Sequence, residues 1–207
     1  MKRIICLLSA SLTLGLAGAA YAEGGEWDID SKHSGATFTV RHMMVSNVPG
    51  HMGGVTGKVK YDGKNIDDIK VKCTLDPASI NTGEADRDTH LKGPDFFDVT
   101  KFPTITFEST GVIPINGGGF KLAGNLTMHG VTKKVELSVD GPTEPFKDTK
   151  KGTEKIGATA TTVVNRKDFG INYNKTLDNG GVAVSDDVKI TLDLEMGRKI
   201  EDKVSAK

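Results

Sequence analysis

Apolar and polar residues alternate with a period of two through most of the chain. In one such stretch Phe38 and Val40 share one face, while Thr37 and Thr39 share the other. Successive side chains of a strand point to opposite faces of a sheet, so the pattern predicts a strand with one buried and one exposed face. Segments 55–61, 69–76, 104–108, 120–128, 131–139, 156–164 and 188–196 repeat the pattern. The chain is therefore predicted to be all-β, with about eight to ten mostly antiparallel strands.

The segment from Asn81 to Lys92 departs from this alternation. Asn81 can cap a helix because Glu84 follows three residues later, and Gly93-Pro94 provides a stop signal. The residues between are poor in types that favour strands. One short helix is predicted to interrupt the all-β chain.

Many half-buried strands must hide their apolar faces, and a sandwich or a closed barrel would both do so. The alternation alone does not decide between them. Several inward positions hold small residues, namely Ala36, Gly57, Gly124, Ala158 and Ala160. Such residues either leave room inside a barrel or permit close packing of neighbouring segments, and both interpretations stay open.

The N-terminal residues have the features of an export signal. A positively charged start and an apolar stretch over residues 4–20 lead to Ala20 and Ala22, the two small residues that a signal peptidase reads. We expect a signal peptide over residues 1–22, cleaved after Ala22, a single domain over residues 23–207, and a periplasmic location. A retained membrane anchor is the alternative, but the apolar stretch is barely long enough to span a bilayer.

The charge of the expected domain is close to balanced. Two of the 27 basic side chains, Lys2 and Arg3, belong to the signal, which leaves 25 against 27 acidic ones. This balance gives no reason to expect nucleic acid as a partner. No later segment approaches about 18 continuous apolar residues, so no stable membrane span is expected.

Cysteine usage excludes an internal disulfide in the expected domain. Cys6 lies in the signal, which leaves Cys73 alone. Because Cys73 falls on the apolar side of the alternating stretch 69–76, we predict an inert, buried thiol.

Asp88 and His90 are the strongest candidates for acid-base chemistry. A histidine near a carboxylate is a usual beginning of a catalytic site. No Gly-x-Ser-x-Gly motif accompanies the pair, and Arg87 is interpreted as an anchor that ties the helix to the barrel. No catalytic residue is expected, although an enzyme that acts on a lipid remains an alternative.

His42, Met44 and His51 form the one combination that suggests a metal. Thioether and imidazole ligands together suit copper in an exported protein. On a strand, however, His42 and Met44 face the same way simply because they are two residues apart. No zinc-binding spacing occurs in the sequence. We expect no metal and no cofactor, with a copper-type site as an alternative.

Several longer motifs point to a known family. In chain order they are Trp27-Asp28-Ile29-Asp30, Arg87-Asp88-x-His90-Leu91, Asp95-Phe96-Phe97-Asp98, Phe102-Pro103-x-Ile105-x-Phe107, Gly124-x-Leu126-Thr127-x-His129-Gly130 and Asn165-Arg166-x-Asp168-Phe169-Gly170. With these motifs the chain resembles the YceI-like family of exported polyisoprenoid-binding proteins, from Trp27 to about Met196.

The resemblance implies a lipocalin-like antiparallel barrel with an apolar tunnel. In this family the tunnel sheathes a long isoprenoid or related lipid of the polyprenyl or quinone type, without catalysis, and the protein often forms a homodimer. One position departs from the family, because Met52, preceded by His51, stands where an aromatic residue is usual after Gly50. If that aromatic touches the ligand, the lipid preference of this chain differs.

The expected tunnel residues are those on the inward faces of the strands. They are Phe38, Val40, His42, Val71, Ile105, Phe107, Leu122, Leu126, Ile190 and Leu192, with Phe96, Phe97 and Phe169 near the ends. Phe96 and Phe97 could instead seal the helix against the barrel. Arg87, His90 and Arg166 are the candidates for contact with a polar head group. A purely structural domain with a filled interior is the remaining alternative.

Overall fold

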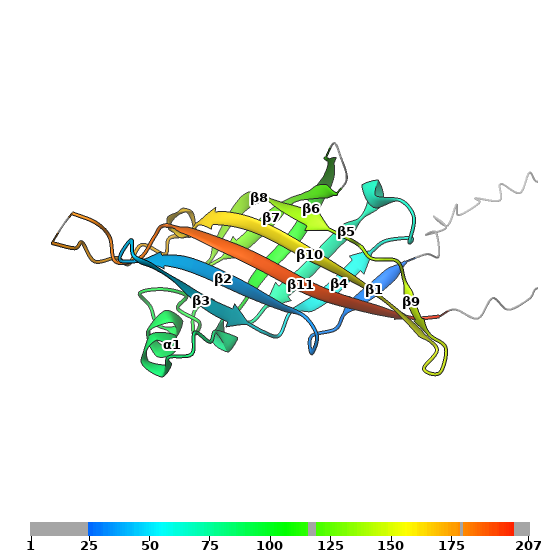
Figure 1. Ribbon diagram of the computed structural model, residues 1–207, viewed down its shortest axis with the longest axis horizontal. Helices are drawn as coiled ribbons and strands as arrows, with labels where there is room; N and C mark the ends of the chain where they lie inside the picture. The colour runs from blue at the N-terminus through cyan, green and yellow to red at the C-terminus, as the bar shows by residue number, and fades with distance from the viewer. Residues whose placement is uncertain (1–24, 116–118, 179, 201–207) are drawn as a thin grey trace, which may run out of the picture.

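The computed structural model describes residues 25–115, 119–178 and 180–200, and these residues are dominated by antiparallel strands (Figure 1). The strands are β1 (Glu26–Ile29), β2 (Gly35–His42), β3 (Ser46–Met52), β4 (Thr56–Lys60), β5 (Lys70–Leu75), β6 (Ile105–Pro114), β7 (Phe120–Met128), β8 (Val131–Asp140), β9 (Phe146–Asp148), β10 (Thr153–Asn165) and β11 (Asp187–Lys199). One α-helix, α1 (Ala85–Lys92), and three 3-10 turns, η1 (Ile66–Asp68), η2 (Pro77–Ser79) and η3 (Arg166–Phe169), complete them. The predicted signal peptide over residues 1–22 lies outside the described residues.

The strands close into a barrel. Eight of them lie side by side in the order β11-β1-β4-β5-β6-β7-β8-β10, and pairing of β10 with β11 completes the ring. That last ladder is the longest, and it runs from Thr153 opposite Lys199 to Asn165 opposite Asp187. The prediction of an antiparallel, lipocalin-like barrel of about eight strands with one short helix is confirmed, and a sandwich is excluded.

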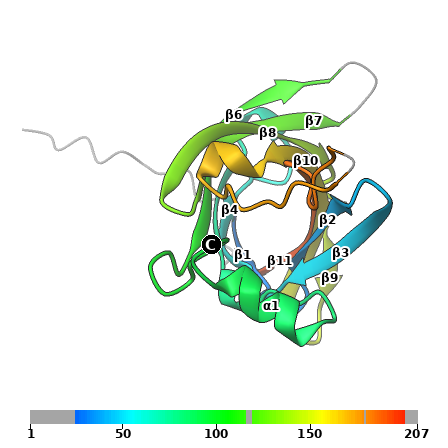
Figure 2. The same ribbon diagram turned by 90° about the vertical axis from the view of Figure 1, so that its left-hand side faces the viewer.

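The β2–β3 hairpin extends the wall at one end of the barrel. Strand β11 pairs with β2 over Lys189–Asp193 and with β1 at Met196 and Gly197, so β1 and β2 occupy the same edge of β11 one after the other. At this end α1 lies beside β3 (Figures 1 and 2). The backbone of Asn81, just before α1, bonds to His51 of β3. We call this the α1 end of the barrel.

The helix begins later than predicted. Its N-cap is Glu84, whose carboxylate accepts hydrogen bonds from the backbone N–H groups of Asp86 and Arg87. The predicted cap, Asn81, instead accepts from the N–H of Gly83 in the preceding turn. Here the glutamate caps the helix that follows it. The capping pattern therefore identified the helix correctly but placed its first residue too early.

Two of the small inward residues serve close packing. A Cβ on Gly57 would lie 2.2 Å from the carbonyl oxygen of Lys72, and φ at this glycine is +146°. A Cβ on Gly124 would lie 2.4 Å from the ring of Phe107. The close-packing interpretation therefore holds for these two positions.

Trp27 of β1 is buried toward the end of the barrel opposite α1 (Figure 1). Its side chain is fully buried, and its indole N–H donates to the carbonyl oxygen of Tyr61 at 2.9 Å. The guanidinium of Arg198 lies 4.0 Å from the ring centroid, and its Nε donates to Glu154 at 2.6 Å. A stacked aromatic, cation and carboxylate thus fill the base of the barrel.

The part of the chain that the structure describes contains no helix with the length and hydropathy of a membrane span.

The substitution Trp27→Ala should cost about 3–5 kcal/mol of unfolding free energy, because it empties a fully buried site and removes the support of Arg198. Urea unfolding followed by circular dichroism measures the change. Phe146→Ala is the matched control, since this ring is 67% exposed and its removal should change stability by less than about 0.5 kcal/mol. Equal effects of the two substitutions would contradict the role assigned to Trp27.

Candidate functional site

A cavity of about 430 Å³ occupies the interior of the barrel. Its walls come from the inward positions of the strands, and one complete wall is the ladder of β10 with β11. The residues of that wall are Ile156, Ala158, Ala160, Thr162 and Val164 on β10 and Val188, Ile190, Leu192, Leu194 and Met196 on β11. Five alternate positions on one strand span roughly 26 Å along that strand. The space is therefore long, and its volume falls in the range of about 300–1,000 Å³ typical of ligand pockets.

The structure places twelve of the thirteen predicted tunnel residues on the cavity wall. They are Phe38, Val40, His42, Val71, Phe96, Phe97, Ile105, Phe107, Leu122, Leu126, Ile190 and Leu192. Phe96 and Phe97 are thus lining residues in this structure, and they come from the segment that follows α1.

Phe169, also predicted to line the tunnel, does not belong to the cavity wall of this structure. It lies in η3, where the chain leaves the alternation of β10, and its side chain is 1% exposed within the hydrophobic core. Its carbonyl oxygen accepts a hydrogen bond from Nδ1 of His129 at 3.1 Å. The 3-10 turn that carries Phe169 contacts β8 and β10.

The cavity opens at the α1 end. Four of its lining residues are exposed to solvent, namely His42, Arg87, His90 and Lys175, and all of them lie at this end. We call these four residues the mouth. The opposite end carries the buried Trp27.

Arg87 is fixed by the segment that precedes its helix. Its Nε donates to the hydroxyl oxygen of Thr82 at 2.8 Å, and its Nη2 donates to the Thr82 carbonyl oxygen at 3.0 Å. Asp88 accepts from the hydroxyl and from the backbone N–H of the same threonine. The hydroxyl hydrogen bond is the main reason why the pKa of Asp88 is lowered from its ordinary value. Both side chains hold the start of α1 in place.

Asp88 and His90, the candidates for acid-base chemistry, are not hydrogen-bonded to each other. Asp88 is bonded to Thr82, whereas Nε2 of His90 lies 2.8 Å from a carboxylate oxygen of Asp95. The imidazole edge also packs against the rings of Phe96 and Tyr173, with centroids 5.1 and 4.9 Å away. His90 therefore joins the α1 region to the segment around Tyr173 at the mouth.

Arg166 holds the other side of the cavity end. It is 4% exposed, and its Nη1 donates to the carbonyl oxygens of Ile171 and Tyr173, both at 2.8 Å. Its Nε donates to the carbonyl oxygen of Ser185 at 3.0 Å, and Asp186 lies 3.3 Å from Nη2. Burial lowers the pKa of Arg166 from its usual value. These bonds fix an irregular segment that has no strand partner for its carbonyl groups.

The structure does not bring the suggested copper ligands together. His42 lines the cavity, whereas His51 pairs with Thr37 on the outward face of the same hairpin. Met44 is 57% exposed in the turn between the two strands. The copper-type alternative is therefore wrong in its geometry.

Another group of potential metal ligands among the described residues lies on the outside of the barrel. Asp30, His33 and Glu195 converge there, with the ammonium group of Lys155 bonded to Glu195. An ion-paired lysine at this position accounts for the cluster without a metal.

Comparison with known proteins agrees with this architecture. A family model described as the YceI-like domain matches residues 27–196. This chain belongs to the YceI-like family. A UPF0312 protein of Staphylococcus aureus strain N315 is 35% identical over 166 residues, which cover 80% of this chain and 94% of that protein.

Solved structures share the YceI-like fold. The YceI protein of Campylobacter jejuni aligns with a TM-score of 0.62 at 30% identity, over 76% of this chain and 89% of that one. A polyisoprenoid-binding domain from Saccharophagus degradans aligns with a TM-score of 0.60 at 13% identity, over 82% of this chain and 97% of that one. At 13% identity, the similarity to the Saccharophagus degradans domain is a similarity of fold alone.

Sequence reasoning missed one side of this YceI-like cavity. Tyr173, Lys175, Ala183 and Val184 line it from the irregular segment between η3 and β11. This segment has no alternation that could have identified them. The inward Ala36, Ala158 and Ala160 also line the cavity, so the interpretation that small residues leave room holds for the three alanines.

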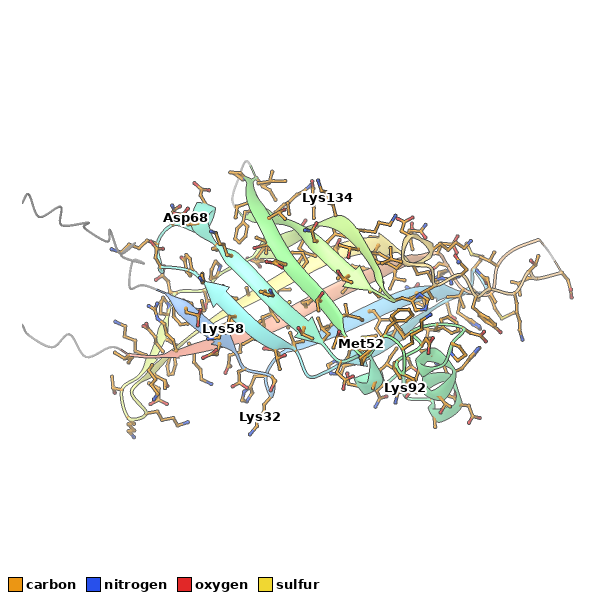
Figure 3. The ribbon with its side chains drawn as sticks, turned by 180° about the vertical axis from the view of Figure 1, so that it is seen from behind. Lys32, Met52, Lys58, Asp68, Lys92 and Lys134 are labelled. Carbon is orange, nitrogen blue, oxygen red and sulfur yellow. The ribbon has the colours of Figure 1, made fainter. Side chains whose placement is uncertain are left out.

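Met52, the position at which the sequence resemblance suggested a departure from the family, lines the cavity wall. Its side chain is 5% exposed, and Figure 3 shows it toward the α1 end of the barrel, where Lys92 is also labelled. A thioether side chain is more flexible than a ring, so this part of the wall can adapt its shape.

The polar groups of the lining are concentrated near the mouth and are cationic or neutral. Arg87, Arg166 and Lys175 carry positive charge, and His42 and His90 lie beside them. No aspartate or glutamate belongs to the described lining of the cavity.

Cys73 lies in the cavity wall and should be inert in the folded protein. It is 4% exposed, and burial raises the pKa of its thiol from 9.0 to about 11. At about pH 8 the lowered thiolate fraction alone should slow alkylation by iodoacetamide about a hundredfold relative to the urea-unfolded chain. Mass spectrometry of timed reactions measures both rates, and similar rates in the two states would contradict the assignment.

Proposed function

We propose that this protein binds and carries a long-chain isoprenoid or related lipid, of the polyprenyl or quinone type, without catalysis. The observation that carries the proposal is the long apolar cavity that opens at one end of a closed barrel. The related fold from Saccharophagus degradans is described as a polyisoprenoid-binding domain, which supports the same class of ligand.

The energetics of such a cavity are sufficient for binding. Each methylene moved from water into an apolar wall contributes about 0.8 kcal/mol, so roughly 15 carbons contribute about 12 kcal/mol before the costs of association. After those costs, micromolar or tighter affinity remains. Apolar contacts alone can therefore retain the tail.

The head group would stay at the mouth. Arg87, His90 and Lys175 lie at the open end, while the opposite end carries the buried Trp27. A tail that enters first leaves its polar end beside these side chains. Their charge favours a neutral or anionic head group over a cationic one.

A binding role has more support than a catalytic one. The carboxylate of Asp88 and the imidazole of His90 have separate hydrogen-bond partners, and both partners serve to fix α1 and its neighbours. A structural role explains why these two side chains are present, whereas no structural role explains the cavity.

Lipid retained by the purified protein is the direct test. Protein isolated without detergent should release a stoichiometric long-chain lipid into organic solvent, and mass spectrometry identifies it. Protein that contains no lipid and takes up neither a prenol nor a quinone would refute the proposal.

A cavity-filling variant sharpens this test. Ala160→Phe places a ring on the cavity wall, so the retained lipid loses space for at least two methylenes, which lowers affinity roughly tenfold or more. Val163→Phe is the matched control on the outward face of β10, where Val163 is 61% exposed, and should bind normally. Equal lipid content in both variants would place the ligand outside the barrel.

We also propose that the protein works in the periplasm after removal of residues 1–22. The apolar stretch that precedes Ala22 and the small residues at Ala20 and Ala22 support this location. Cell fractionation followed by intact-mass measurement should find a periplasmic chain that begins at Glu23. A full-length chain in the membrane fraction would favour the anchor instead.

A further inference from the structure

We propose that the turn between β2 and β3 docks on the surface of a phospholipid membrane and lets lipid pass between the bilayer and the cavity. The turn exposes three consecutive large apolar residues: Met43 is 46% exposed, Met44 57% and Val45 75%. The inference rests on the proposed function, because it concerns how a lipid reaches the barrel. We call these three residues the tip.

The conformation of the tip is unusual for its sequence. Met43 and Met44 have φ values of 50° and 62°, and the N–H of Val45 donates to the carbonyl oxygen of His42 at 2.9 Å. Two successive residues with positive φ in such a turn normally favour Asn and Gly. Two methionines are therefore held outward in a conformation that their side chains disfavour, which points to a role for the exposed thioethers.

The tip is joined to the cavity mouth by the backbone. The N–H of Met43 donates to the carbonyl oxygen of Ala183 at 2.8 Å, and His42 forms a β-bridge with Val184. His42, Ala183 and Val184 all line the cavity. Backbone hydrogen bonds thus hold the tip beside the mouth.

The location of the tip distinguishes it from the other exposed apolar residues. Ile113, Ile115, Phe146 and Val163 are also exposed, but none of them lines or adjoins the mouth. Figure 1 shows the β2–β3 turn at the same end of the barrel as α1, whereas β9, which carries Phe146, lies at the opposite end. Among the exposed large apolar residues that the structure describes, those of the tip directly follow His42, a residue of the mouth.

Charges around the tip suit a surface of lipid phosphates. Arg41 precedes the tip and is exposed, and Lys175 is exposed beside Ala183, whose N–H bonds to the Lys175 carbonyl oxygen. The same segment also carries carboxylates: Asp186 is paired with Arg166 and Lys167, whereas Asp178 and Asp187 are exposed. Two cations that flank an apolar tip match the interface, where acyl chains lie below anionic groups. Flexible methionine side chains adapt readily to such a fluid partner.

The test compares delivery of the same probe from a bilayer and from solution. Vesicles of phosphatidylethanolamine and phosphatidylglycerol carry an NBD-labelled geranylgeraniol and a rhodamine-labelled lipid that quenches it, so transfer to the protein raises NBD fluorescence. Vesicle flotation measures docking directly. Uptake of the probe from dilute ethanol measures the cavity without a membrane.

The tip variant combines Met43→Asn, Met44→Asn and Val45→Ser, which removes the apolar surface while asparagine tolerates the positive φ values. It should lose flotation with vesicles and transfer the probe from them at least about tenfold more slowly. Uptake from ethanol should stay within about twofold of the unaltered protein. Phe146→Ser is the matched control and should behave as the unaltered protein in all three assays, because its exposed ring lies away from the mouth.

Several outcomes would overturn the inference. Unchanged flotation and transfer by the tip variant would do so, and so would an equal loss in Phe146→Ser. If light scattering shows a dimer that only the tip variant disrupts, while the unaltered protein does not bind vesicles, the tip instead contacts a second copy of the chain.

Should the triple variant fail to fold, Val45→Ser alone removes the most exposed side chain at a smaller risk. Failure of the unaltered protein to take up the probe from ethanol would refute lipid binding itself, whereas flotation would still report on docking.

Discussion

The structure depends on closure of the sheet between β10 and β11. This ladder runs the full length of both strands and turns a row of half-buried strands into a ring. Once the ring is closed, every inward side chain faces a shared interior. An eight-stranded barrel is just wide enough for its own side chains to fill or for one ligand to enter, so residue size decides between the two. Ala36, Ala158 and Ala160 on that inner surface favour the open result.

Different interactions stabilise the two ends of the barrel. At the base, the indole of Trp27 packs against the guanidinium of Arg198, which is hydrogen-bonded to the carboxylate of Glu154. At the mouth, hydrogen bonds hold irregular segments in place where strand pairing has ended. The first arrangement excludes solvent, and the second leaves polar side chains at the surface. This asymmetry gives a tail and a head group different environments within one cavity.

Much of the fold could be predicted because alternation reports directly on a half-buried strand. The same pattern identified twelve cavity residues, since inward positions on a closed sheet must line its interior. Alternation could not distinguish a glycine needed for close approach, such as Gly57, from an alanine that leaves room, such as Ala158. That distinction depends on what lies opposite each position.

Predictions failed where regular pairing stops. Phe169 belongs to a 3-10 turn, so the inward face of β10 does not continue to it. His42 and His51 are close in sequence, but the turn between β2 and β3 places them on opposite faces of the hairpin. The cavity residues Tyr173 and Lys175 belong to a segment whose path is set by long-range hydrogen bonds. Such contacts leave no periodic signal in the sequence.

The buried Arg166 explains how this irregular segment can be held firmly. Removing an arginine from water is costly, and a well-packed apolar residue is often more favourable at a buried site. Here, however, the carbonyl groups of Ile171, Tyr173 and Ser185 need donors that no neighbouring strand supplies. A single guanidinium satisfies all three in fixed directions, which an apolar side chain or a lysine could not do. The charge is thus retained at the mouth because it orders the backbone on which the open end of the cavity is built.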